Sequence, residues 1–61
     1  MMHFRFVMKY PAEEPGLCVC RECVVAAFNE NVALQRALLE AHNFAQENNI
    51  PYYRVELKEA A

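Results

Sequence analysis

The chain contains one long run, from residue 29 to residue 49, whose apolar residues repeat with the period of an α-helix. At its start, Asn29 and Asn31 both suit the N-cap position, where a side-chain oxygen accepts a hydrogen bond from a first-turn N–H. At its end, two asparagines that tolerate a left-handed backbone precede Pro51, which cannot continue a helix. The sequence therefore predicts one helix between these limits.

This helix is amphipathic. One continuous face is apolar and has to be buried, and it comprises Ala33, Leu34, Ala37, Leu38, Ala41, Phe44 and Ala45. The opposite stripe is polar, as on a solvated side, and comprises Arg36, Glu40, Asn43 and Glu47. The alanines follow one another at i, i+4 and have little side-chain volume, so this face should pack flat on a sheet. Val32 and Leu39 form a separate strip, which is either a partner surface or an ordinary pair of exposed apolar residues.

Three segments around the helix have the alternation or the composition of β-strands. Residues 3–10 place four large apolar side chains on one side, namely Phe4, Phe6, Met8 and Tyr10. Residues 51–59 alternate in the same way. Residues 17–28 are rich in valine and are interpreted as a strand, although two helical turns would also fit them. A turn before this segment and the capping asparagines after it favour the strand.

Residues 11–16 connect the first two strands, with Pro15 and Gly16 in the positions that a type II turn favours. In the second strand, Arg21 and Glu22 are adjacent, so neither face of the strand is uniformly apolar. A β-bulge is therefore expected near them.

The element order ββαβ predicts an α+β domain. Its three strands form an antiparallel sheet in the order 2-1-3, and the one helix packs on one face. The competing layout is βααβ, with residues 18–28 helical. With 61 residues the chain has room for a single small domain, 1–61, whose burial barely outweighs chain entropy. A homodimer or a permanent partner is a reasonable expectation at this size.

The composition restricts the chemistry. The chain lacks Ser, Thr, Asp and Trp and has one glycine, which removes hydroxyl nucleophiles and Gly-rich phosphate loops. We therefore expect no enzymatic activity and no cofactor. No apolar run approaches the roughly 20 residues that span a bilayer, so no membrane association is expected. The first residues lack the pattern of a secretory signal, which predicts a cytoplasmic protein.

The three cysteines, Cys18, Cys20 and Cys23, have a spacing that could supply zinc ligands together with His42 or His3. In a strand, however, Cys18 and Cys20 share a face and Cys23 points away. The preferred interpretation is that they are small apolar core residues in a reducing cytoplasm, so no metal site is assigned. A small zinc-binding protein remains an alternative.

Basic residues gather on the face of the sheet away from the helix. We predict that this face binds a partner through Arg5, Lys9, Tyr52, Arg54 and Lys58. The partner is expected to be a protein, with nucleic acid as the alternative, since Tyr52 offers a ring on which a base could stack. Cross-strand pairing between lysine and glutamate is the alternative that needs no partner. The open backbone of an edge strand is a second route to a protein partner or to a homodimer.

The arrangement of a hairpin followed by strand, helix and strand over VVAAFNENVALQRALLEAHNFAQENNIPYYRVEL is similar in outline to very small phage and mobile-element proteins that bind and inhibit host enzymes. The resemblance implies a regulatory or inhibitory role and assigns no functional residue. Together these features predict a small interaction module that modulates another protein through its sheet face or an edge strand.

Overall fold

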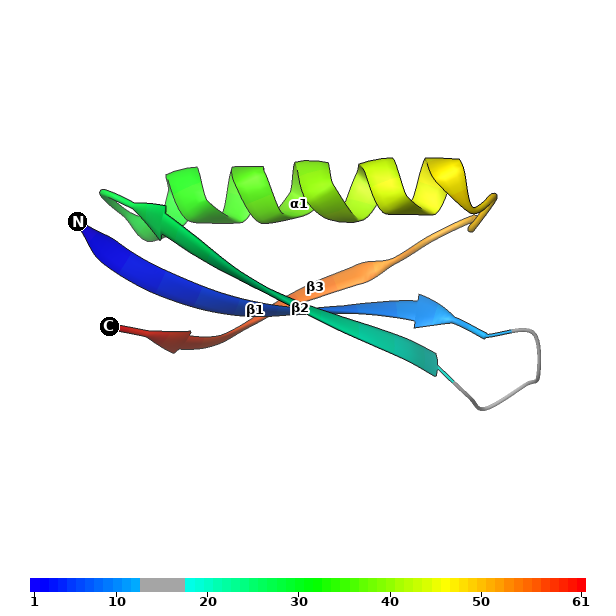
Figure 1. Ribbon diagram of the computed structural model, residues 1–61, viewed down its shortest axis with the longest axis horizontal. Helices are drawn as coiled ribbons and strands as arrows, with labels where there is room; N and C mark the ends of the chain where they lie inside the picture. The colour runs from blue at the N-terminus through cyan, green and yellow to red at the C-terminus, as the bar shows by residue number, and fades with distance from the viewer. Residues whose placement is uncertain (13–17) are drawn as a thin grey trace.

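The computed structural model describes residues 1–12 and 18–61. Its elements follow one another as β1 (Met2–Pro11), β2 (Cys18–Ala27), α1 (Glu30–Glu47) and β3 (Arg54–Ala60). The strands form one antiparallel sheet in the order β2-β1-β3, and α1 lies along one side of it (Figure 1). This confirms the α+β fold, the strand order and the strand assignment of the second segment. The expected Pro15-Gly16 turn lies outside the described residues.

β1 is the central strand because one of its sides is almost entirely large and apolar. Phe4, Phe6, Met8 and Tyr10 are all buried, as the alternation predicts. α1 covers them with its alanine ladder, whose members are also buried: Ala33, Ala37, Ala41 and Ala45. Large side chains from the sheet thus meet small ones from the helix, and the core is one layer between the two.

The flanks of the helix differ in part from the expectation. Leu34 and Phe44 are half-buried, but Leu38 is 39% exposed, because a sheet of three strands is too narrow to cover the whole apolar arc. The expected Val32/Leu39 strip is also divided. Val32 packs against the core cluster, whereas Leu39 is 61% exposed.

The helix ends where its sequence signals place the limits. The side-chain oxygen of Asn29 accepts a hydrogen bond from the Val32 N–H at 2.9 Å, which identifies Asn29 as the N-cap. After the last turn, Asn49 adopts the left-handed conformation with φ of 56°. The Ile50 N–H then donates to the Ala45 carbonyl at 2.8 Å, so the chain leaves the helix with its final carbonyls satisfied.

The expected bulge near Arg21 and Glu22 is wrong. β1 and β2 pair without interruption from Met2 opposite Ala27 to Pro11 opposite Cys18. No bulge is needed, because the Arg21 guanidinium lies 4.1 Å from the centre of the Phe44 ring and keeps a charged group at the rim of the core. The irregularity falls instead between β1 and β3, where the register shifts between Arg5 and Phe6.

β3 begins at Arg54 rather than at residue 51, because residues 51–53 pass the end of α1 before they reach the sheet. Tyr53 packs there against Tyr10, with ring centroids 6.5 Å apart. At the opposite end of the molecule the two termini lie side by side, since the backbone groups of His3 and Ala61 bond to each other at 2.6 and 2.8 Å (Figure 1). Within the described residues, no helix combines the length and the hydrophobicity that crossing a membrane requires.

The N-cap is a first test of this fold. Replacing Asn29 with alanine removes the acceptor for the Val32 N–H and should lower the free energy of unfolding by about 1 kcal/mol, measured by urea denaturation. The matched control is Asn31→Ala, because Asn31 is an exposed first-turn residue that serves as no cap. Equal losses in the two variants would contradict the assignment.

The alanine ladder of α1 provides a second test of this fold. Ala37 is fully buried, so Ala37→Leu should push the helix away from the sheet and lower the free energy of unfolding by about 1–3 kcal/mol, although leucine is almost as good a helix former. Leu39→Ala, a change on the exposed side, should alter stability by less than about 0.5 kcal/mol. Tolerance of leucine at position 37 would show that the helix and sheet are not closely packed.

Candidate protein-binding surface

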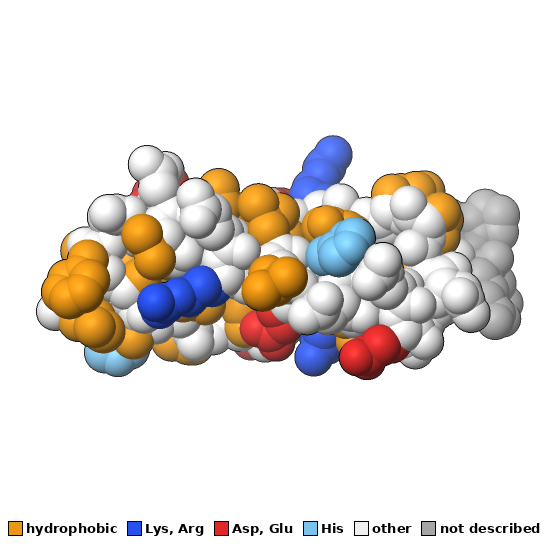
Figure 2. Space-filling model, turned by 90° about the horizontal axis from the view of Figure 1, so that it is seen from above, with side chains coloured by type: hydrophobic (Ala, Val, Ile, Leu, Met, Phe, Trp, Pro, Cys, Tyr) orange, Lys and Arg blue, Asp and Glu red, His pale blue; other side chains and the backbone are white. Residues whose placement is uncertain are grey.

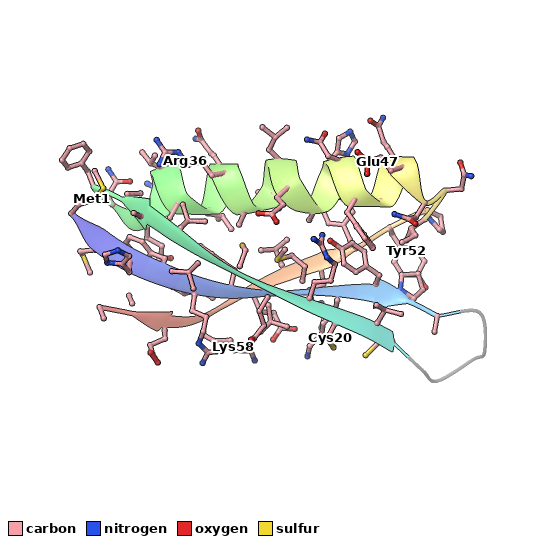
Figure 3. All side chains as sticks on the ribbon, in the orientation of Figure 1. Met1, Cys20, Arg36, Glu47, Tyr52 and Lys58 are labelled. Carbon is pink, nitrogen blue, oxygen red and sulfur yellow. The ribbon has the colours of Figure 1, made fainter. Side chains whose placement is uncertain are left out.

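The side of the sheet away from α1 has no covering layer within the described residues. We call this side the open face. The alternation and register of the strands place twelve residues on it: His3, Arg5, Val7 and Lys9 of β1; Cys18, Cys20, Glu22 and Val24 of β2; and Arg54, Glu56, Lys58 and Glu59 of β3. Cys20 and Lys58 both lie on this side of the sheet in Figure 3. The open face therefore holds four of the five residues predicted to bind a partner.

Carboxylates neutralise most of these cations. Arg5 contacts Glu22 of the neighbouring strand at 2.9 Å. Lys9 and Lys58 both contact Glu56, each at 3.1 Å. Hydrogen bonds from Lys9 and Lys58 hold the pKa of Glu56 below its ordinary value, and the bond from Lys9 has the larger effect. The open face is thus a surface of mixed charge, and the expected concentration of positive charge on it is largely cancelled.

The two remaining residues of the predicted set have different surroundings. Arg54 is exposed and forms no ion pair with any part of the chain that the structure describes. Tyr52 precedes β3 and is 66% exposed, so its expected position among the cations of that strand is wrong. It lies instead beside the end of α1 (Figure 3) and lines a hollow of about 350 Å³. The rest of that lining is apolar or amide: Pro11, Ala12, Asn48, Asn49, Ile50 and Pro51.

The cysteines separate into a pair and a single residue. Cys18 and Cys20 share the open face, as expected, but both are exposed rather than part of the core. Cys23 lies on the helix side, half-buried, with its sulfur 3.7 Å from the sulfur of Met8. Three thiols on two faces cannot bind one metal ion, and the described residues contain no cluster of three His, Cys, Asp or Glu side chains that could do so. Burial raises the pKa of the Cys23 thiol.

The edge formed by β2 has open backbone groups. The N–H and C=O groups of His3 bond to Ala61, so they point toward β3. Backbone groups alternate in direction along a strand, so those of Phe4 point toward β2. Ala26 lies opposite His3 in β2, and its backbone groups therefore point away from β1, toward the outer edge. By the same alternation the outer edge carries the N–H and C=O groups of Cys18, Cys20, Glu22 and Val24. An exposed edge of this length can accept another strand.

One end of this edge is closed. Nη1 of Arg36 donates a hydrogen bond to the Ala26 carbonyl at 2.8 Å, across the start of the helix. The helical pattern places Arg36 on the solvated stripe of α1 and does not predict this contact. The one sequence feature that could predict it is that Arg36 follows Ala26 by ten residues, so its guanidinium can reach back to the end of the preceding strand. The accessible part of the edge therefore runs from Cys18 to Val24.

The apolar side chains along the accessible part are exposed. Val24 is 63% exposed on the open face, and Val19 is 47% exposed on the helix side. The opposite edge, β3, is shorter and carries Glu56, Lys58 and Glu59, and charge of this kind discourages strand pairing. Seen from the helix side, the remaining apolar side chains form separate groups among polar ones (Figure 2). The β2 edge is therefore the best candidate surface.

Comparison of the chain with protein-family models, with curated proteins and with solved structures finds no match.

The ion pairs of Glu56 predict a pH dependence of stability. The folded-state pKa of Glu56 is lowered, so the group stabilises the fold above its ordinary pKa and loses this effect as the pH falls through the folded-state value. Glu56→Gln should therefore have a lower urea midpoint than the native chain at about pH 7, and the difference should vanish toward about pH 3.

The control is Glu59→Gln, whose carboxylate contacts no cation within residues 1–12 and 18–61. Its urea midpoint should stay close to that of the native chain throughout. A difference for Glu56→Gln that is constant across this pH range would contradict the role of its ion pairs.

Proposed function

We propose that this chain is a non-enzymatic protein-binding module that adds an extended segment of another protein to the edge of β2. The observation that supports this proposal is the row of outward-facing backbone groups from Cys18 to Val24, which no other described segment covers. Backbone hydrogen bonds supply the affinity in strand addition, and alternate side chains supply the specificity. The resemblance in layout to small inhibitory proteins agrees with a modulating or inhibitory role.

The side chains along the edge specify what the added segment should look like. On the open face it would lie beside Val24 and Glu22, and on the helix side beside Arg21 and Val19. An alternating segment with apolar residues near the two valines fits these neighbours. Glu22 and Arg21 already contact Arg5 and Glu40, so polar residues beside them are sufficient. The carboxylates of the open face favour such a protein segment over nucleic acid, because Glu22 and Glu56 already occupy three of the cations that phosphates would need.

A proline at position 24 tests the proposal. The Val24 N–H faces outward and forms no ladder bond to β1, so Val24→Pro should remove an edge donor and crowd an incoming strand while the fold persists. Tagged native and variant chains are purified from the cells that produce them, and the associated proteins are quantified by mass spectrometry. Any partner of the native chain should be depleted at least about tenfold with the variant.

Two matched controls separate strand addition from other effects. Val24→Ala keeps the N–H and should retain most of the partner. Ala60→Pro places the same ring at an exposed, outward-facing position of the other edge and should retain it fully. Circular dichroism and urea denaturation verify that each variant is folded. The proposal is overturned if Val24→Pro retains its partners, or if Ala60→Pro loses them to the same extent.

A further inference from the structure

The thiols of Cys18 and Cys20 form a pair that the proposed strand addition does not use. The residues are two apart on β2, so their backbones are separated by about 6.6 Å along the strand. Their sulfurs are nevertheless only 3.7 Å apart, which means that the two side chains lean toward each other. Both are exposed on the open face, at the end of β2 that is farthest from α1's first turn.

This separation matches the spacing of two ligands around one tetrahedral ion. Zinc binds thiolate sulfur at about 2.3 Å, and two such bonds at the tetrahedral angle place their sulfurs about 3.8 Å apart. The pair therefore has the spacing of half of a tetrahedral thiolate site without any rearrangement of the backbone.

The described residues of one chain do not complete the site. Structural zinc takes four protein ligands, and no third candidate ligand clusters with the pair in the part of the chain that the structure describes. Cys23 cannot serve, because it lies on the other face of the sheet with its sulfur against Met8. Two ligand positions are thus left unfilled by residues 1–12 and 18–61, and a second copy offers an identical and equally exposed pair.

We propose that Cys18 and Cys20 of two copies bind one zinc ion as a tetrathiolate site and thereby join the chains into a homodimer. Binding releases four thiol protons and leaves a complex with a net charge of −2. Lys9 lies opposite Cys20 in the sheet and shares Glu56 with Lys58, and these three groups together carry a net charge of +1, so the two copies together offset the charge of the complex. A domain of 61 residues also gains from a metal bridge, since its own core is small.

This inference uses the thiols of Cys18 and Cys20, whereas the proposed function uses the backbone groups of β2, so the two can be tested separately. The ion would sit at the hairpin end of β2 and would leave the backbone groups of Glu22 and Val24 open. Val24→Pro should therefore keep the zinc site, and cysteine variants should leave strand addition at Val24 in place. Failure of one proposal can be recognised without failure of the other.

Native mass spectrometry of the reduced, metal-free chain titrated with zinc sulfate is the test. The expected species contains two chains and one zinc ion, and it should dissociate on addition of a chelator. Cobalt titration of the same sample should give the intense ligand-field bands of a tetrahedral thiolate complex. Because protons compete for the thiolates, the zinc-bridged dimer should disappear as the pH is lowered.

Variants identify the ligands. Cys18→Ala and Cys20→Ala should each abolish the zinc-bridged dimer, whereas Cys23→Ala should retain it at the same ratio of zinc to chain. Both ligand positions are exposed, so these two variants should keep their fold, as circular dichroism verifies. The proposal is wrong if one zinc binds per single chain, if the native chain takes up no zinc, or if Cys23→Ala loses the metal while still folded.

Discussion

Close contact between the alanine ladder of α1 and the large side chains of β1 is the interaction on which the rest of this structure depends. With one helix and three strands, the domain can form only one core layer, and that layer must be dense to offset chain entropy. Small residues on the helix allow Phe6 and Met8 to be completely buried. The same contact fixes the direction of α1 along the sheet and so determines which side of the sheet stays uncovered.

The uncovered side shows how such a small domain manages polar surface. Its cations are distributed over β1 and β3. Glu22 of β2 pairs with Arg5, and Glu56 of β3 pairs with Lys9, so ion pairs join both outer strands to β1. Pairs of this kind add little stability individually. Their larger effect is to cancel most of the charge of this face, whereas the β2 edge presents backbone groups rather than charges.

Much of this fold could be predicted from the sequence, because periodicity determines which residues are buried. The alternation of β1, the Asn29 cap and the strand order all follow from local pattern. The errors come from tertiary contacts that pattern does not encode. Arg21 needs no bulge because Phe44 lies under its guanidinium, Leu38 is exposed because the sheet is narrow, and Tyr52 is displaced because the chain must pass the end of α1. The candidate edge was predicted, whereas its closure by Arg36 was not.

The hydrogen bond from Arg36 to the Ala26 carbonyl also bears on assembly beyond a single partner. A sheet with two free edges that can pair with each other can add copies of itself head to tail without limit, which leads to fibres. Here the Arg36 side chain occupies one end of the β2 edge, and the β3 edge is short and charged. The β2 edge is therefore the one that favours pairing, and a contact between the β2 edges of two copies uses both of them and does not repeat. Self-association through this edge would then end at two copies, so the chain would stay a discrete particle and would not extend into a fibre.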